Sequence, residues 1–297
     1  MSRAVRPPLV LGFPDYRDEA RRFADVIDAD FAMVDIHHFP DGESLVRLPE
    51  TLPGEVVFFT SLDRPNARLI ELELAAAAAP GLGAKRLTLI APYLCYMRQD
   101  IAFHPGEAVS QRIIGGLLAR RFDTLVTVDP HLHRTAHLAE AVPVRRAVTL
   151  TAAPAMAAAL HERGDTPVLL GPDAESEQWV ARIAGLAGLE FGVAGKRRSG
   201  DREVHITLPD IELAGRHVVL VDDIASTGRT LLEAARALDA RDVLSVSVMV
   251  THALFVGDAI EQLHAAGVTD ITSTDSVRHD SNRIALADLL AGGLDGH

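Results

Sequence analysis

The chain has 297 residues and a formal net charge of −12, a size that suits two α/β domains and a charge that argues against nucleic acid as the main partner. Its longest apolar runs fall far short of the roughly 20 residues that span a bilayer, and residues 1–12 lack the apolar core of a secretory signal. The only cysteine, Cys95, excludes an intrachain disulfide. We therefore expect a cytoplasmic protein that binds neither nucleic acid nor a membrane.

Strand-like and helix-like patterns alternate along the first half of the chain. Short aliphatic runs indicate buried strands, and apolar residues spaced three or four positions apart indicate helices. We expect strands at 9–12, 31–36, 44–49, 54–60, 85–92 and 124–128, and helices at 15–28, 66–79 and 110–120, with Ser110 capping the last of these.

The second half repeats this rhythm without repeating the residues. We expect strands at 167–170, 189–194, 203–208, 218–221, 243–251 and 268–272, and helices at 151–163, 176–187, 257–266 and 284–291, with one more that ends near 238. Such alternation implies right-handed crossovers and mostly parallel sheets. The predicted fold is α/β, with one domain at 1–147 and a second at 148–297.

The stretch most informative about function follows the aliphatic run at 218–221. Asp222 and Asp223 come at the carboxyl end of that run, where open α/β sheets bind ligands. Hydroxyls, a glycine and the free N–H groups of a helix start come next, and this combination suits a phosphate monoester. The acidic pair suits ribose hydroxyls, directly or through Mg²⁺. The residues concerned are Asp222, Asp223, Ser226, Thr227, Gly228, Arg229 and Thr230.

Two stretches of the first half combine aromatic, acidic and basic residues. Phe39, Asp41 and Glu43 surround an Asp-Gly turn; they form an ordinary hairpin turn or present an aromatic ring and carboxylates to a base. The segment from Tyr93 to Asp100 follows a strand and includes Arg98 and Gln99, so it is a surface loop or a phosphate-binding loop.

Polar residues follow two further strands. His131, with His133 and His137, matches neither HExxH nor a zinc-finger spacing, so contact with a Mg²⁺-nucleotide is a better interpretation than zinc. Asp173 follows the strand at 167–170 and is either a helix cap or a metal-binding carboxylate.

The basic run from Lys196 to Arg198 stands in an otherwise acidic chain. Such a run is usually a solvated loop. In a hairpin beside a phosphate site, however, it would stabilise the negative charge that phosphoryl transfer spreads over several oxygens. Closing over the substrate, it would also exclude water.

Taken together, these motifs resemble the ribose-phosphate pyrophosphokinase family. The resemblance spans about residues 9–280 and looks closest to archaeal-type members. The acidic pair with Ser-Thr-Gly-Arg-Thr resembles the loop that type I phosphoribosyltransferases share with this family. The matching segments are 39–43, 92–100, 128–131, 171–173, 196–198 and 222–230.

The resemblance implies two tandem type I phosphoribosyltransferase-like domains, with ATP on the first and ribose 5-phosphate on the second. It implies transfer of the pyrophosphoryl group of Mg-ATP to the 1-hydroxyl of ribose 5-phosphate, and a homo-oligomer that is a dimer or a larger assembly such as a hexamer. The implied ATP-binding residues are Phe39, Asp41, Glu43, Arg98, Gln99, Asp100 and His131.

The remaining roles follow from the same matches. His131 and Asp173 would lie by Mg²⁺, and Lys196 and Arg198 would act in catalysis. The acidic pair and the residues from Ser226 to Thr230 would bind ribose 5-phosphate.

Some residues depart from the family pattern. Ile101 and Ala102 stand where a basic residue often follows Arg-Gln-Asp, which removes one phosphate contact. Two alternatives share the same loop: a phosphoribosyltransferase or a regulator with that fold, and a non-catalytic partner of such synthetases. The length of 297 residues counts against the first, and the retained basic and acidic residues count against the second.

Overall fold

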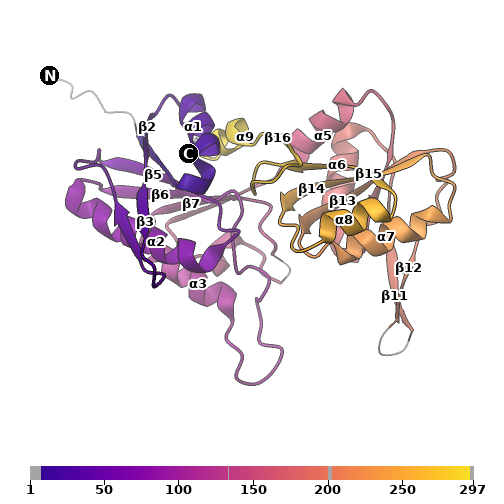
Figure 1. Cartoon of the computed structure of the whole chain (residues 1–297), viewed down its shortest axis with the longest axis horizontal. Coiled ribbons are helices and arrows are strands. Elements are labelled where there is room, and N and C mark those ends of the chain that lie inside the picture. Colours follow the sequence, from indigo (N-terminus) through magenta and orange to yellow (C-terminus); the bar gives the residue numbers. More distant parts are fainter. Residues whose placement is uncertain (1–7, 133, 200–202, 295–297) are drawn as a thin grey trace. The chain divides into compact units, whose positions relative to one another are not determined.

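The computed structural model describes residues 8–132, 134–199 and 203–294. The chain forms two compact units: unit 1 is Met1–Leu150 with Ala287–His297, and unit 2 is Thr151–Leu286. These units differ from the expected domains 1–147 and 148–297 at both junctions. Residues 148–150 complete a strand of unit 1, and the last helix, α9 (Ala287–Gly292), packs against α1 (Arg17–Val26) of the same unit (Figure 1).

Unit 1 is built on a six-stranded, all-parallel sheet with the strand order β2-β1-β5-β6-β7-β8. The sheet strands are β1 (Leu9–Gly12), β2 (Asp30–Met33), β5 (Glu55–Phe59), β6 (Arg86–Ile90), β7 (Thr124–Val128) and β8 (Arg146–Leu150). A separate antiparallel hairpin pairs β3 (Asp35–His38) with β4 (Ser44–Arg47). The other helices are α2 (Pro65–Ala78), α3 (Ser110–Ala119) and α4 (Leu138–Ala141), with 3-10 turns at Pro14–Tyr16 and Ala79–Leu82.

Unit 2 contains a second six-stranded parallel sheet, with the order β10-β9-β13-β14-β15-β16. Its strands are β9 (Val168–Gly171), β10 (Phe191–Val193), β13 (His217–Ala225), β14 (Ser245–Ala253), β15 (Val268–Thr274) and β16 (Asn282–Ile284). Its helices are α5 (Ala153–Glu162), α6 (Glu177–Ala187), α7 (Arg229–Asp239) and α8 (Ala259–Ala265), with a 3-10 turn at Ala174–Ser176. A hairpin of β11 (Gly195–Ser199) and β12 (Glu203–Thr207) extends from the unit (Figure 1).

The two units have the same strand order. In each, the second strand lies at the sheet edge, a two-stranded hairpin follows it, and the third sheet strand returns beside the first. The hairpin β3–β4 of unit 1 therefore corresponds to β11–β12 of unit 2. This shared topology confirms two copies of one α/β fold with parallel sheets.

The sheets form where the sequence supplies short aliphatic runs. Leu11, Phe58 and Leu125 of unit 1 and Leu170 and Leu220 of unit 2 are completely buried. Each such side chain contributes about 1.5–3 kcal/mol by leaving water. Strands covered by helices on both faces explain why these runs do not alternate with polar residues.

The structure corrects several sequence predictions. The expected strand 31–36 is two strands, because the chain turns at buried Val34, whose N–H donates to the Gly12 carbonyl at 2.9 Å. Ser110 does not cap α3; its hydroxyl donates to Gln99 instead. The expected strand 218–221 continues to Ala225, and strands β8 and β16 were not predicted.

The longest helix among the described residues, α2, has 14 residues. Over the described ranges, no helix is both long and apolar enough to cross a membrane.

Candidate functional site

Unit 2 gathers three carboxylates where its strand order changes direction. Asp173 follows β9, and Asp222 and Asp223 lie near the end of the neighbouring strand β13. Burial raises the pKa of Asp222 well above its ordinary value, and the negative charges of Asp223 and Asp173 raise it further. Hydroxyl donors or a cation would relieve this repulsion, and the switch point between β9 and β13 is where such folds bind ligands.

The loop after the carboxylates leads into the N-terminus of α7. Gly228 adopts a left-handed conformation with φ of +66°, and its carbonyl accepts the first helical hydrogen bond, from the N–H of Leu232 at 2.8 Å. The amides of residues 229–231 precede that bond, so they are available to an anion. The loop is braced from behind, because Phe255 N donates to the Ala225 carbonyl at 2.8 Å and Val256 N donates to the Ser226 carbonyl at 2.9 Å.

The hydroxyl-bearing residues and Arg229 of this loop differ in their surroundings. The structure gives neither Thr227 nor Thr230 a side-chain capping role, since Gly228 occupies the cap position of α7. The Arg229 side chain is exposed and its Nε donates to Glu233 one turn along the helix, at 3.0 Å. In this structure the Arg229 guanidinium is therefore engaged along its own helix.

Unit 1 presents its predicted residues at the carboxyl ends of two adjacent strands. The segment 98–100 lies beyond β6 and His131 lies beyond β7, and these strands pair directly. Arg98 is exposed, while the Gln99 side-chain oxygen accepts the Ser110 hydroxyl at 2.7 Å. Because the carboxyl ends of parallel strands meet at one edge, Arg98, Gln99 and His131 share one end of the sheet.

Asp100 is buried and binds Arg134, a residue that no motif indicated. Asp100 Oδ1 lies 2.9 Å from a guanidinium nitrogen of Arg134, whose side chain remains 56% exposed. The Arg134 guanidinium also lies over the Phe103 ring, 6.0 Å from its centre. The only feature of the sequence that could have pointed to Arg134 as a site residue is its position three residues after His131. Asp100 thus binds Arg134, and this pair adds a further cationic side chain at this end of the sheet.

The hairpin β3–β4 displays the residues of the Asp-Gly turn. Phe39, Asp41 and Glu43 are all exposed. The turn is closed by the Phe39 N–H, which donates to the Glu43 carbonyl at 2.8 Å, and the Glu43 N–H donates to Asp41 Oδ1 at 3.1 Å. The rings of His37 and Phe39 pack edge to face, with 4.9 Å between their centres. An exposed aromatic ring can stack on a base. The carboxylates beside it can accept hydrogen bonds from an amino group of that base.

The basic run forms part of the corresponding hairpin of unit 2. Lys196 and Arg198 occupy alternate positions of β11, paired with Ile206 and Val204 of β12. The basic run from Lys196 to Arg198, a pattern that is usually a solvated loop, is therefore part of a strand that ends at Ser199. Residues 200–202 lie outside the described ranges.

The predicted metal-binding residues belong to different units. His131 lies in unit 1 and Asp173 in unit 2. Asp173 also caps the turn Ala174–Ser176, accepting the Glu175 N–H at 3.0 Å. Within the described part of the chain, no cluster of three or more metal-binding side chains occurs. The crowded carboxylates around Asp222 nevertheless fit Mg²⁺, which takes few protein ligands and keeps several waters.

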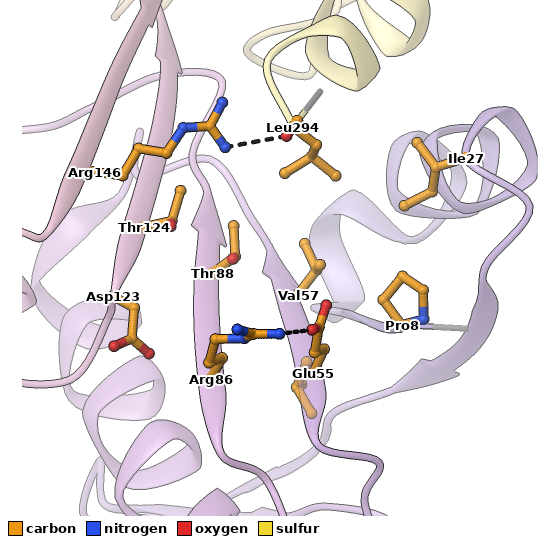
Figure 2. Close-up of a pocket in the computed structure, with 11 residues that line it drawn as sticks. Pro8, Ile27, Glu55, Val57, Arg86, Thr88, Asp123, Thr124, Arg146 and Leu294 are labelled. Atoms are coloured by element: carbon orange, nitrogen blue, oxygen red, sulfur yellow. Dashed lines mark hydrogen bonds and ion pairs between the residues drawn. The ribbon is translucent and has the colours of Figure 1, made fainter. Parts of the chain in front are cut away.

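A cavity of about 370 Å³ lies at the opposite edge of the unit 1 sheet, by the amino ends of β5 to β8. Figure 2 shows Arg146 directed to the carbonyl of Leu294 and Arg86 directed to Glu55. Asp123 of this cavity accepts the backbone N–H of Leu87 at 3.0 Å. The charged side chains here already have partners, and Arg146 binds the carbonyls of Gly293 and Leu294. The cavity lies at the amino ends of the strands, so it is separate from the candidate site.

Cys95 is a buried residue of the loop at 93–100. Burial raises the pKa of its thiol to about 12. The thiolate, which is the nucleophilic form, is therefore scarce at neutral pH. This observation supports a packing role for the only cysteine.

Family models match both halves of the chain. Residues 10–121 match the N-terminal domain of ribose phosphate pyrophosphokinase, and residues 149–279 match the phosphoribosyl transferase domain. The first match covers the hairpin β3–β4 and the Arg98 segment, and the second covers the carboxylates and the α7 loop.

Curated relatives match nearly the whole length. A ribose-phosphate pyrophosphokinase of Methanopyrus kandleri is 36% identical over 93% of this chain and 94% of that protein. Ribose-phosphate pyrophosphokinase 2 of Archaeoglobus fulgidus is 36% identical over 93% of this chain and 96% of that protein. A crystal structure of phosphoribosylpyrophosphate synthetase from Mycobacterium smegmatis covers 97% of both chains with a TM-score of 0.82 at 22% identity, which shows the same fold.

Proposed function

Because this chain belongs to the ribose-phosphate pyrophosphokinase family, we propose that it transfers the pyrophosphoryl group of Mg-ATP to the 1-hydroxyl of ribose 5-phosphate. The products are phosphoribosyl pyrophosphate and AMP. The observation that carries the proposal is the match to relatives of this name over 93% of the chain.

Unit 2 is the proposed site of ribose 5-phosphate. Asp222 and Asp223 accept hydrogen bonds from the ribose hydroxyls, and binding of these donors offsets the repulsion that raises the pKa of Asp222. The 5-phosphate takes the amides at the start of α7 and the hydroxyls of the same loop. The residues assigned to the phosphate are Ser226, Thr227, Gly228, Arg229 and Thr230.

Unit 1 is the proposed site of ATP. Phe39 stacks on adenine, with Asp41 and Glu43 as acceptors for its amino group. Arg98 and Gln99 bind the phosphates from the end of β6, and His131 binds them from the end of β7. Asp100 belongs to this site through Arg134, which it holds in place.

Mg²⁺ is the proposed cofactor, and His131 in unit 1 and Asp173 in unit 2 are the residues of each unit that we propose to lie by the ion or its waters. When bound, the ion neutralises charge on the ATP phosphates and polarises them toward attack. The carboxylates near Asp222 suit a hard cation that prefers oxygen ligands.

Lys196 and Arg198 are the proposed catalytic residues. The leaving AMP and the transferring group together develop negative charge on several oxygens, and cations placed there stabilise the transition state more than the ground state. Their location on a two-stranded hairpin supports a role in covering the substrate, since such a ribbon extends beyond the sheet (Figure 1).

The proposal extends to the working form of the protein. We infer a homo-oligomer, a dimer or a larger assembly such as a hexamer, in which the turn at Phe39 serves the ATP site of a neighbouring subunit. We also propose a cytoplasmic location, which accords with the free thiol of Cys95.

The test is an assay of the purified chain with ATP, Mg²⁺ and ribose 5-phosphate, with products identified by mass. We expect AMP and phosphoribosyl pyrophosphate in equal amounts. Absence of both products would support a non-catalytic partner. Consumption of added phosphoribosyl pyrophosphate only in the presence of a free base would support a phosphoribosyltransferase.

A further inference from the structure

Glu71 is a buried carboxylate on α2 that the proposed chemistry does not use. Its residue is 2% exposed, and it lies on the helix that packs against the hairpin β3–β4. A carboxylate is rarely buried unless it is paired, because an isolated charge loses its hydration. The partners of Glu71 therefore indicate what its burial achieves.

One oxygen of Glu71 binds both sides of the hairpin turn. His38 and Ser44 face each other in the hairpin as the last residue of β3 and the first of β4. His38 Nε2 lies 2.7 Å from Glu71 Oε1, and the Ser44 hydroxyl donates to the same oxygen at 3.2 Å. The residues between these two are Phe39 to Glu43. Both ends of the turn are therefore bound by the same atom, Glu71 Oε1.

The other oxygen of Glu71 is held by Arg68, one turn earlier on the same helix. Arg68 Nη1 and Glu71 Oε2 form an ion pair at 2.9 Å, and Arg68 Nη2 donates to Asp15 Oδ2 at 2.6 Å. The Arg68 guanidinium lies over the Phe13 ring, 4.8 Å from its centre. Glu71 is thus fixed relative to the segment that follows β1, and it transmits that position to the hairpin.

The hairpin needs such an anchor because it forms a two-stranded sheet of its own, unpaired with the sheet of unit 1. A lone two-stranded hairpin is marginally stable in water. The turn's own hydrogen bonds, such as Gly42 N–H to the Phe39 carbonyl at 2.9 Å, fix its shape but not its position.

We propose that Glu71 is the positioning residue of the turn 39–43 and thereby sets the preference of the enzyme for adenine nucleotides. The inference rests on the proposed function, in which Phe39 and its neighbouring carboxylates recognise the base. Glu71 itself touches no substrate. Its loss leaves the phosphate-binding residues at the strand ends in place and lets the turn move.

The readout is the ratio of kcat/KM for ATP to kcat/KM for GTP with ribose 5-phosphate as acceptor. In Glu71→Ala we expect this ratio to fall about tenfold, with KM for ATP raised and KM for ribose 5-phosphate unchanged. Glu71→Gln keeps an oxygen for the hairpin but places an amide against Arg68, so its ratio should lie between those of the wild type and Glu71→Ala.

Two further variants separate positioning from folding. The double variant with His38→Ala and Ser44→Ala leaves the Arg68 pair intact and removes only the hairpin contacts; it should reproduce the lowered ratio even if Glu71→Ala fails to fold. Glu73→Ala is the matched control, because Glu73 lies two residues along α2 and its carboxylate binds Arg121 at 2.7 Å instead of the hairpin.

The control should keep the wild-type ratio. If the wild type is active and its ratio of kcat/KM for ATP to GTP is unchanged in both Glu71→Ala and the double variant, the role of Glu71 is overturned while the proposed function stands. A wild-type chain that forms no product from ATP and ribose 5-phosphate would overturn the proposed function and, with it, this inference.

Discussion

Asp100 binds Arg134 through both of its carboxylate oxygens. Oδ1 lies 2.9 Å from the Arg134 guanidinium, and Oδ2 accepts the Arg134 backbone N–H at 3.2 Å. Asp100 is buried whereas the Arg134 side chain is 56% exposed, so the carboxylate anchors an arginine that stays partly accessible to a ligand. The pair joins the loop after β6 to the segment after β7, which are the two segments proposed to bind the ATP phosphates.

The Asp100–Arg134 pair predicts a selective effect on ATP. Asp100→Asn removes the charge that holds the guanidinium, and a charge-assisted hydrogen bond of this kind is worth roughly 1.5–3 kcal/mol. We expect KM for ATP to rise about tenfold, with KM for ribose 5-phosphate unchanged. Steady-state kinetics with each substrate varied in turn measures both constants.

Arg120→Ala is the control for that experiment. Arg120 is an exposed arginine at the far end of α3, away from the strand ends that form the candidate site. The Arg120→Ala variant should keep the wild-type KM for ATP and the wild-type KM for ribose 5-phosphate. Equal increases in KM for the two substrates in Asp100→Asn would argue for a general loss of structure.

Lys196→Ala should lose most of kcat and keep nucleotide binding. The lysine is proposed to stabilise charge that develops only in the transition state, and removing such a donor costs roughly 100-fold or more in rate. Single-turnover rates and binding of a non-hydrolysable ATP analogue test the two halves of this prediction. Lys85→Ala, an exposed lysine beside β6, provides the comparison. Turnover near the wild-type rate in Lys196→Ala would reject the catalytic role.

Asp222→Asn should stabilise the protein at neutral pH while it removes activity. The pKa of Asp222 in the folded chain is raised, chiefly by burial and then by the charges of Asp223 and Asp173. A raised carboxyl pKa gives stability that is complete below the unfolded-state pKa and is lost as the pH rises through the folded-state pKa. At neutral pH an ionisable side chain at this position therefore costs stability relative to one that is always neutral, and asparagine avoids that cost.

Thermal unfolding of Asp222→Asn and wild type across the pH range tests the sign. We expect the variant to unfold at a temperature roughly 2–4 °C higher at pH 8, as about 1 kcal/mol implies for a chain of this size. The difference should shrink toward pH ~4, where the wild-type carboxyl is protonated. A variant that is less stable than the wild type at pH 8 would contradict the assigned shift.

Gly228→Ala should weaken ribose 5-phosphate binding. Gly228 has φ of +66°, where a side chain costs about 1 kcal/mol, and relief of that strain would move the amides at the start of α7. Gly164→Ala is matched to it, since Gly164 has φ of +75° in a loop after α5. Both variants should lose similar stability, but only Gly228→Ala should raise KM for ribose 5-phosphate.

The sheet strands were the most predictable part of the fold. Aliphatic runs such as 9–12 and 124–128 are buried on both faces, so the pattern alone located them. The pattern misplaced the end of β13, because acidic residues usually end a buried strand, whereas Asp222 and Asp223 continue this one to Ala225. Their carboxylates remain at the end of the sheet that was predicted to bind a ligand.

The supporting residues of the site were less predictable. Glu71 is one of two acidic residues in a helix rich in leucine and alanine, and the sequence gives no periodic signal that separates it from the less buried Glu73. Its pairing with His38 and Ser44 depends on how the hairpin packs, which is a tertiary property. Arg134 likewise acquires its place from Asp100, which is 34 residues earlier in the chain.

The most direct test of the proposed function uses ATP labelled in its β-phosphate, together with Mg²⁺ and ribose 5-phosphate. Transfer of the pyrophosphoryl group moves the β- and γ-phosphates together, so the label should appear in phosphoribosyl pyrophosphate in a one-to-one ratio with unlabelled AMP. Label recovered in ADP would indicate single phosphoryl transfer. Label recovered in free pyrophosphate, or no turnover at all, would contradict the account.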